Sequence, residues 1–316
     1  MNIAIFTNNY LPNPYGVTGS VESFRRELTK AGHLVYIFAP RWPDYVDQNS
    51  RVFRYPSLDL KLKIRFPIPI PYSRKIDKIL ENLEIDVIHS QHPNLVGSAA
   101  MKWARRLARR RGGKKIPLIF TWHTLYDHYA HFAKFVPEKL AAGYIIKKAV
   151  HYANQSDAVI VPTDSIIPII DKWGVKNENI FSVATGIEKE DFENPNKEAI
   201  RSKYEIEKNE IVLLLVSRLT SEKNIEFVFR AVFPILKNNS KIKFLVSGGG
   251  DLISRLKELV QKEQLDRQVI IAGVVERKEL KNYFAAGDIF VYGSKSETQG
   301  MVVSEAMYLG LPVVAV

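Results

Sequence analysis

The chain has 316 residues, of which 46% are hydrophobic and 25% charged, a composition that excludes a disordered protein. Its length predicts two lobes, because one hydrophobic core rarely grows beyond about 300 residues. The 45 Lys and Arg residues exceed the 34 Asp and Glu residues, and the net charge of +11 favours phosphate-bearing ligands, nucleic acid or an anionic membrane surface. The absence of cysteine excludes disulfides, thiolate catalysis and cysteine-ligated metals and predicts a cytoplasmic location.

The first half of the sequence alternates short β-branched and apolar runs with longer segments of helical period, which is typical of βαβ units. The first apolar run is not expected to be a signal peptide, because it is too short and lacks a basic leader. No apolar run is long enough to span a bilayer. The expected strands are Ile3–Thr7, Leu34–Ala39, Val52–Tyr55, Val87–His89, Leu118–Thr121 and Ala158–Pro162. The expected helices are Val21–Ala31, Arg74–Leu83, Leu95–Arg111 and Glu138–Ser156.

The pattern restarts after a polar, proline-containing stretch around residues 188–197. The expected strands of this half are Ile211–Ser217, Lys243–Gly248, Val269–Ala272, Ile289–Tyr292 and Val313–Val316, and its helices are Asn224–Leu236, Leu252–Glu263, Arg277–Ala286 and Val302–Leu309. The alternation predicts two Rossmann-like, doubly wound lobes, residues 1–187 and 188–316, that face a ligand-binding cleft. Because the sequence stops inside the last apolar strand, we expect the second lobe to be truncated.

Three strand-to-helix connections have the composition of ligand-binding loops. Gly16 and Val17 precede a helix, where backbone amides can approach a ligand and the helix dipole favours negative charge. Arg218 and Lys223 follow a strand and could neutralise a diphosphate leaving group without a metal. Gly249 lies in a glycine run that suits close approach by a base or ribose. Plain turns and surface charge around a helix cap are the competing explanations.

The most specific pattern is a pair of glutamates, Glu297 and Glu305, separated by seven residues across a loop and the start of a helix. Between them, the amides of Gly300, Met301 and Val302 are expected to point out of the helix N-terminus, where they and the dipole favour a sugar diphosphate. One carboxylate could then bind the sugar hydroxyls and the other a ribose.

Residues 297–314 resemble the donor-site signature of glycosyltransferase family 4, the retaining, glycogen-synthase-like group. Arg218 and Lys223 match the basic pair that contacts the donor diphosphate in that family, Gly16 matches its N-terminal glycine loop, and residues 185–187 resemble its crossing between lobes. The matches span nearly the whole chain in the same order. The resemblance implies a GT-B fold, retention of anomeric configuration, a nucleotide-sugar donor and no metal or other cofactor.

Carried onto the matching positions, the resemblance implies that Glu297 lies near the donor sugar and Glu305 near the nucleotide ribose. It also places His123 where the family has a histidine that contacts the transferred sugar, so the implied catalytic residues are His123, Glu297, Arg218 and Lys223. Gly293 departs from the family pattern, in which proline is more usual. The histidines of the chain show no recognised zinc spacing with a carboxylate partner, so no metal site is expected.

Residues 62–72 alternate apolar residues with prolines and have basic residues on both sides. Such a segment cannot form a regular helix, but it can present apolar side chains to an interface while cations meet acidic headgroups. The residues expected at the membrane are Lys63, Arg65, Phe66, Ile68 and Ile70. Trp103 and the arginines that follow it are expected to extend this surface.

Residues 123–129 further resemble the acceptor region of diacylglycerol glucosyltransferases within the family, which implies that Tyr126 and Asp127 lie near the acceptor. We therefore expect a hexosyltransferase, peripheral at the inner face of the membrane, that moves a sugar such as glucose from a UDP-sugar to a lipid such as diacylglycerol. The alternatives are a soluble transferase acting on a small sugar or polyol, and a nucleotide-binding module without turnover. No nucleic-acid partner is expected, because aromatic residues are not interleaved with the arginine-rich segment.

Overall fold

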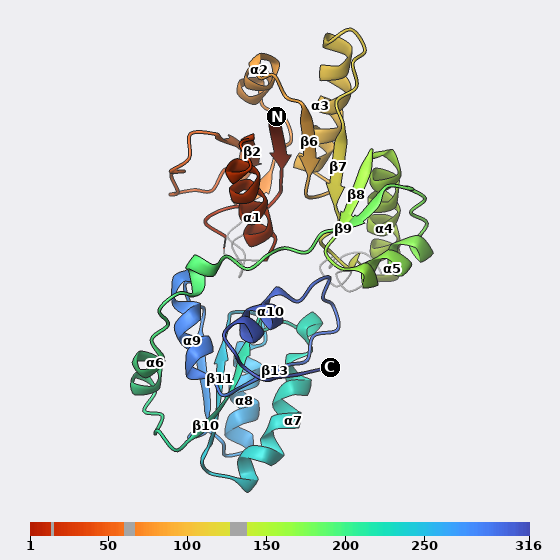
Figure 1. The fold of residues 1–316 in the computed structure, drawn as a ribbon. Helices are drawn as coiled ribbons and strands as arrows, with labels where there is room; N and C mark the ends of the chain where they lie inside the picture. The colour runs from red at the N-terminus through yellow and green to blue at the C-terminus, as the bar shows by residue number, and fades with distance from the viewer. Residues whose placement is uncertain (14–15, 60–66, 127–137) are drawn as a thin grey trace. The chain divides into compact units, whose positions relative to one another are not determined.

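The computed structural model describes residues 1–13, 16–59, 67–126 and 138–316 and contains two compact units, Met1–Gly186 and Ile187–Val316 (Figure 1). Each unit is built on its own parallel sheet, and each sheet has the strand order of a doubly wound fold. The predicted α/β class, with two Rossmann-like lobes, is confirmed.

The sheet of unit 1 has seven strands in the order β3-β2-β1-β6-β7-β8-β9. These strands are β1 (Asn2–Phe6), β2 (Leu34–Pro40), β3 (Val52–Tyr55), β6 (Val87–Ser90), β7 (Leu118–Thr121), β8 (Ala158–Val161) and β9 (Ile180–Ser182). The helices are α1 (Gly16–Lys30), α2 (Arg74–Asn82), α3 (Val96–Arg110), α4 (Glu138–Gln155) and α5 (Ile167–Trp173). A separate antiparallel pair joins β4 (Ser57–Leu58) to β5 (Ile68–Pro69).

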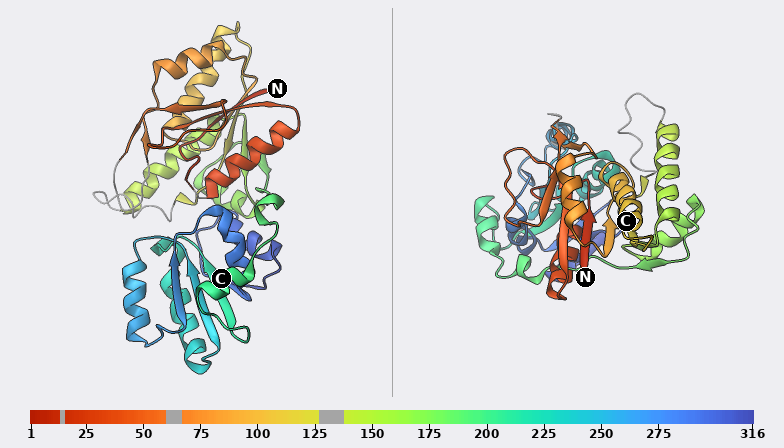
Figure 2. Two further views of the ribbon diagram at one scale, coloured as in Figure 1. Left: turned by 90° about the vertical axis from the view of Figure 1, so that its left-hand side faces the viewer. Right: turned by 90° about the horizontal axis from the view of Figure 1, so that it is seen from above.

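Both faces of β1 are buried, which explains why it has a continuous apolar sequence. Ile3 and Ile5 pack in the hydrophobic cluster that includes Val21 of α1, whereas Ala4 and Phe6 belong to the cluster on the opposite face. Figure 2 shows α1 on one side of the sheet and α3 and α4 on the other. The helices therefore enclose the sheet from both sides.

The expectation that Trp103 contributes to a membrane-facing surface is wrong. Its side chain is only 2% exposed and packs in the same cluster as Leu107 of α3 and Tyr152 of α4. The sequence placed Trp103 beside several arginines, but the helical period turns the indole toward the sheet and the arginines away from it.

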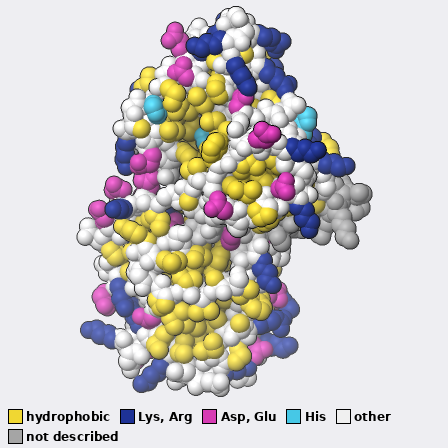
Figure 3. Space-filling view, turned by 45° about the vertical axis from the view of Figure 1, so that its right-hand side comes forward, with side chains coloured by type: hydrophobic (Ala, Val, Ile, Leu, Met, Phe, Trp, Pro, Cys, Tyr) yellow, Lys and Arg dark blue, Asp and Glu magenta, His cyan; other side chains and the backbone are white. Residues whose placement is uncertain are grey.

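The sheet of unit 2 has five strands in the order β12-β11-β10-β13-β14. These strands are β10 (Ile211–Val216), β11 (Ile242–Ser247), β12 (Val269–Gly273), β13 (Ile289–Tyr292) and β14 (Val313–Ala315). The helices are α6 (Lys197–Lys203), α7 (Ile225–Asn238), α8 (Ile253–Lys262), α9 (Leu280–Ala286) and α10 (Met301–Tyr308). Edge strand β14 leaves Val314 63% exposed, and Figure 3 shows broad groups of hydrophobic side chains on this unit.

Most predicted elements occur within a few residues of their expected bounds, and the differences concern helix starts and short elements. α1 begins at Gly16 and not at Val21, so Gly16 and Val17 lie in its first turn. The predicted helix Arg277–Ala286 begins with a 3-10 turn before α9. Strand β9 and helices α5 and α6 were not predicted, because three to seven residues are too few to show a clear periodicity.

A buried arginine joins α6 to the base of the unit 2 sheet. Arg201 is 4% exposed and donates hydrogen bonds to the carbonyl oxygens of Glu207 (3.0 Å), Ala286 (3.2 Å) and Glu210, and its Nη1 lies 3.3 Å from Oδ2 of Asp288. The carbonyl of Glu207 also accepts from the backbone amide of Glu210 at 3.1 Å. The guanidinium therefore satisfies several acceptors at once.

We expect Arg201→Met to lower the free energy of unfolding of unit 2 by about 3 kcal/mol, because the carbonyls of Ala286 and Glu210 and the carboxylate of Asp288 lose the guanidinium. Arg230→Met is the matched control, since the Arg230 side chain is 63% exposed and pairs only loosely with Glu226 at 3.7 Å. The unfolding of unit 2 in urea, followed by hydrogen exchange of the β10 and β13 amides, measures the free energy of unfolding of both variants. Equal unfolding midpoints for the two variants would contradict this role of Arg201.

Candidate functional site

The site residues predicted in unit 2 follow the two strands at which the winding of its sheet reverses. Strands β10 and β13 are neighbours, although the chain leaves β10 toward β11 and returns to β13 on the other side. Ligands of doubly wound sheets bind at the carboxyl ends of such strands. Arg218 and Lys223 follow β10, and Glu297 follows β13, so both predicted loops lie at this point.

An ion pair between a buried lysine and a half-buried glutamate connects the two loops. The ammonium of Lys223, a residue that is 8% exposed, donates to Oε1 of Glu297 at 2.5 Å, and the hydroxyl of Tyr292 donates to the same oxygen at 2.7 Å. Burial alone would raise the pKa of the Glu297 carboxyl, but Lys223 and the hydrogen bonds outweigh it and hold this pKa below its ordinary value. Glu297 is therefore a carboxylate at neutral pH.

Two further hydrogen bonds fasten these loops together. The hydroxyl of Ser296 donates to the carbonyl of Glu222 at 3.0 Å, and the side-chain amide of Asn224 donates to the carbonyl of Gly293 at 3.1 Å. A β-carbon at position 293 would lie 2.5 Å from a methyl group of Val228. Glycine at this departure from the family pattern thus permits close packing, and the cross-links hold the loop.

The N-terminus of α10 lies beside Glu297. Gly300 precedes this helix with φ +70°, a left-handed conformation that favours glycine, and a β-carbon there would lie 3.8 Å from Cγ of Glu297. The first amides of any helix have no carbonyl partner within it, so Met301 and Val302 present donors at this end. The lysine, the carboxylate and the helix N-terminus are therefore brought together.

Arg218 and Glu305 also belong to unit 2, but each pairs with a residue outside the Lys223–Glu297 ion pair. Arg218 pairs with Glu222 at 3.2 Å. Glu305 is 4% exposed and accepts a hydrogen bond from Arg277 at 2.6 Å. Burial raises the pKa of Glu305, and the nearby Arg277 only partly opposes this shift. The two glutamates of the motif therefore have separate cationic partners, Lys223 and Arg277.

Gly249 packs against a neighbouring loop. A β-carbon there would lie 2.5 Å from a methyl group of Val274, and β-carbons at Gly248 and Gly250 would clash with the backbone of Ser217 and Leu219. The glycine run therefore allows β11 to end tightly against the loop after β10. This packing is sufficient to explain Gly248 and Gly250.

In unit 1, three histidines gather at the carboxyl ends of adjacent strands β6 and β7. Nε2 of His123 lies 2.6 Å from Oε1 of Gln91, Nε2 of His89 lies 2.7 Å from the hydroxyl of Thr121, and the rings of His92 and His123 are 6.4 Å apart. Burial lowers the pKa to about 3 for His89 and His92 and to about 4 for His123. All three imidazoles are therefore neutral at physiological pH.

One hydrogen bond fixes where the ring of His92 carries its proton. The backbone amide of Asn8 donates to Nδ1 of His92 at 3.1 Å, so the proton of this neutral ring is on Nε2. The side chain of Gln91 can pair with Nε2 of His123 through its oxygen or its nitrogen, so this contact orients the ring in either tautomer. Gln91 is 1% exposed, and within the described residues its Nε2 has no hydrogen-bond partner.

The other predicted residues of unit 1 are more dispersed. Gly16 and Val17 begin α1, and a β-carbon at Gly16 would meet nothing within 4 Å. Tyr126 is half-buried against Trp122, with ring centroids 5.7 Å apart. Asp127 lies outside the described residues, so the structure gives its predicted acceptor role no geometry.

The predicted membrane segment is described only in part. Lys63, Arg65 and Phe66 lie outside the described residues. Ile68 is half-buried in β5, and Ile70 is 41% exposed. Nearby apolar side chains of the β4–β5 region that are also exposed are Leu58 and Tyr72.

Two general features complete the description of the site. In residues 1–13, 16–59, 67–126 and 138–316, no three His, Asp or Glu side chains are grouped to hold a metal ion. Over the same ranges, no helix has both the length and the apolar composition needed to cross a bilayer.

Three side chains of the site were missed from the sequence: Tyr292, Arg277 and Gln91. A sequence signal existed for Arg277, because it follows the carboxyl end of β12 much as Arg218 follows β10. Gln91 follows β6 in the same way, but glutamine has no charge to draw attention. Tyr292 belongs to the apolar run of β13, which hides its hydroxyl.

Comparisons with known proteins agree with these features. Residues 14–191 match Glycosyltransferase Family 4, and residues 196–316 match glycosyl transferases group 1. The alpha-monoglucosyldiacylglycerol synthase of Streptococcus pneumoniae is 33% identical over all of this chain and 71% of its own length. A GDP-mannose-dependent alpha-mannosyltransferase of Corynebacterium glutamicum is 26% identical over 99% of this chain and 72% of its own.

Solved structures share the fold. Anabaena HepE, in complex with UDP and glucose, has a TM-score of 0.73 at 17% identity over 100% of this chain and 80% of its own. Sucrose-phosphate synthase from Thermosynechococcus elongatus has a TM-score of 0.72 at 20% identity over 99% of this chain and 80% of its own. This likeness confirms the predicted GT-B class. The chain belongs to Glycosyltransferase Family 4.

Proposed function

We propose that this glycosyltransferase moves a hexosyl group, such as glucose, from a UDP-sugar to a membrane lipid such as diacylglycerol, with retention of configuration. The observation that carries the proposal is the convergence of Lys223, Glu297 and the N-terminus of α10 in unit 2. A cation and free backbone donors stabilise negative charge, and a carboxylate accepts hydroxyl hydrogen bonds. A sugar diphosphate needs both kinds of partner.

In this proposal, residues 188–316 form the nucleotide-sugar-binding lobe. Lys223 and Arg218 neutralise the diphosphate, which also receives the amides of Gly300, Met301 and Val302. An ammonium has three donors, so Lys223 can hold a phosphate oxygen while it keeps its bond to Glu297. Glu297 then binds the sugar hydroxyls, and Glu305 binds the ribose beside Gly249.

Residues 1–187 form the acceptor-binding lobe in this proposal. A neutral His123 forms a hydrogen bond with the transferred sugar, and the first amides of α1, at Gly16 and Val17, add donors. Tyr126 and Asp127 contact the acceptor. The lipid acceptor is supported by the names of the relatives in Streptococcus pneumoniae and Acholeplasma laidlawii, both alpha-monoglucosyldiacylglycerol synthases.

Peripheral attachment at the inner face of the membrane completes the proposal. The exposed apolar side chains of the β4–β5 region, Leu58, Ile70 and Tyr72, support an interfacial surface there. The proposed membrane role of Lys63, Arg65, Phe66 and Ile68 rests on the sequence alone. Their basic and apolar character suits an acidic headgroup layer.

A transfer assay tests the proposed function directly. The purified chain is given labelled UDP-glucose or GDP-mannose with vesicles containing diacylglycerol, or with glycerol and glucose as soluble acceptors. We expect labelled lipid from UDP-glucose, and NMR of the product should show the α configuration of the donor. Label transferred only to a soluble acceptor would refute the lipid proposal.

Removal of the Lys223 ammonium is expected to lower kcat/KM for the donor about 100-fold or more, because the leaving diphosphate loses a preorganised charge. Lys223→Met provides this test, and Glu297→Gln should show a loss of similar size. Lys237→Met is the matched control, because Lys237 also pairs with a glutamate at 2.5 Å but on the exposed end of α7. A control loss as large as that of Lys223→Met would remove the argument for this site.

The hydrogen bond from His123 to Gln91 predicts a change in pH dependence. Burial keeps the pKa of His123 at about 4, and the neighbouring His89 and His92 are also neutral. In Gln91→Glu, the new carboxylate favours the imidazolium form of His123 and raises its pKa. As the pH is lowered, His123 therefore becomes protonated at a higher pH in this variant than in the parent chain. The acid limb of the kcat/KM profile should move upward, whereas Thr121→Val, which removes only the bond to His89, should leave it in place. If the acid limb of the kcat/KM profile is unchanged in both variants, Gln91 has no role in catalysis through His123.

A further inference from the structure

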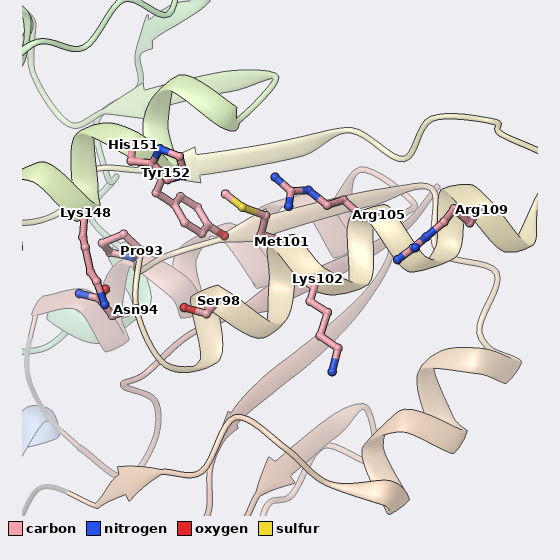
Figure 4. A pocket seen from close by; sticks show the side chains of 10 residues that line it. All are labelled: Pro93, Asn94, Ser98, Met101, Lys102, Arg105, Arg109, Lys148, His151 and Tyr152. Carbon is pink, nitrogen blue, oxygen red and sulfur yellow. The ribbon is translucent and has the colours of Figure 1, made fainter.

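A basic groove lies between α3 and α4 in unit 1, with a volume of about 390 Å³ (Figure 4). None of its residues belongs to the proposed donor or acceptor site. We define the α3–α4 groove by its lining residues, which are Pro93, Asn94, Ser98, Met101, Lys102, Arg105, Arg109, Lys148, His151 and Tyr152. Its walls are thus two helices, and its chemistry combines cations with a few polar and apolar side chains.

The helical period gathers the cations of α3 into this groove. Lys102, Arg105 and Arg109 are spaced by three and four positions, which places them on one stripe of the helix. Lys148 and His151, spaced by three, form the facing stripe on α4, and Figure 4 shows them at the other wall. The fold therefore brings basic side chains of two helices together although the helices are far apart in the sequence.

The positive charge of the groove is not neutralised, whereas the charge next to it is. Arg110 lies 3.1 Å from Glu81, and Lys115 pairs with Asp157. Within the part of the chain that the structure describes, no carboxylate lies within 4.0 Å of the charged groups of Lys102, Arg109 or Lys148.

The floor of the groove is rigid and partly apolar. Tyr152 is 4% exposed, and its hydroxyl donates to the carbonyl of Gly97 at 2.8 Å. Met101 is half-buried beside it, and the guanidinium of Arg105 is held by the side-chain oxygen of Gln155. Fixed donors lose little entropy when they bind an anion.

We propose that the α3–α4 groove binds the phosphate group of an organic phosphate whose carbon portion rests on Met101 and Tyr152. Guanidinium groups bind phosphate in a bidentate manner, and the lysines add point charges. Glycerol phosphate has this chemistry both as a free metabolite and as the headgroup portion of an anionic glycerolipid. The groove shares no residue with the donor residues of unit 2 or with the β4–β5 region, so a free organic phosphate would be a ligand beyond the proposed function. A lipid headgroup in the groove would instead rest on the proposed attachment to the membrane and assign a second contact to it.

The test compares two variants with the same loss of charge. Lys102→Gln/Arg109→Gln removes one lysine and one arginine from the groove, and Arg110→Gln/Lys115→Gln removes one of each from the paired positions beside it. Circular dichroism checks that both variants are folded, and release of UDP from the donor is measured separately. We use sn-glycerol 3-phosphate by calorimetry, and vesicles with and without phosphatidylglycerol by sedimentation.

We expect the groove variant to lose at least about 10-fold in affinity for glycerol phosphate, for anionic vesicles or for both, and the control to change less than about 2-fold. Loss for free glycerol phosphate alone identifies a soluble ligand, and loss for vesicles alone identifies the lipid headgroup. Equal losses in the two variants, or no binding of either probe by the parent chain, would overturn the proposal. Both results are independent of donor turnover.

Discussion

The ion pair between Lys223 and Glu297 is the interaction on which the organisation of unit 2 at its proposed site depends. It joins the loop after β10 to the loop after β13, at the point where the winding of the sheet reverses. A partly buried charge without its partner is costly, so the two side chains hold each other in place. In the proposed function the pair is kept, Lys223 adds a contact to the diphosphate, and Glu297 adds a contact to a sugar hydroxyl. The same pair thus explains the shape of the loops and the ligand that they suit.

Unit 1 contrasts with this charged arrangement. Its histidines are buried, neutral and oriented by Gln91, Thr121 and a backbone amide, so they offer directed hydrogen bonds and no net charge. Four cations of this unit lie elsewhere, in the α3–α4 groove, and these are Lys102, Arg105, Arg109 and Lys148. Neutral groups suit sugar hydroxyls and free cations suit phosphates, and the fold keeps the two kinds apart on different elements.

The sequence predicted the fold well, because the central strands of both sheets are buried and form short apolar runs between amphipathic helices. The loops of the proposed donor site were also visible, since Lys223 and Glu297 lie in the loops that follow predicted strands. Their contact with each other was not visible, because it depends on which strands are neighbours. Arg277 was missed although it follows a predicted strand as Arg218 does, and Gln91 was missed because glutamine carries no charge. Trp103 was placed wrongly because the charge of its neighbours was given more weight than the helical period.

The most direct test of the central claim is a double-mutant cycle for UDP binding, measured by calorimetry on the parent chain, Lys223→Met, Glu297→Gln and the double variant. If the pair acts as one unit around the diphosphate, the double variant binds UDP about as well as the weaker single variant, and the coupling exceeds about 1 kcal/mol. Strictly additive losses, or an affinity for UDP that none of the variants alters, would contradict the account.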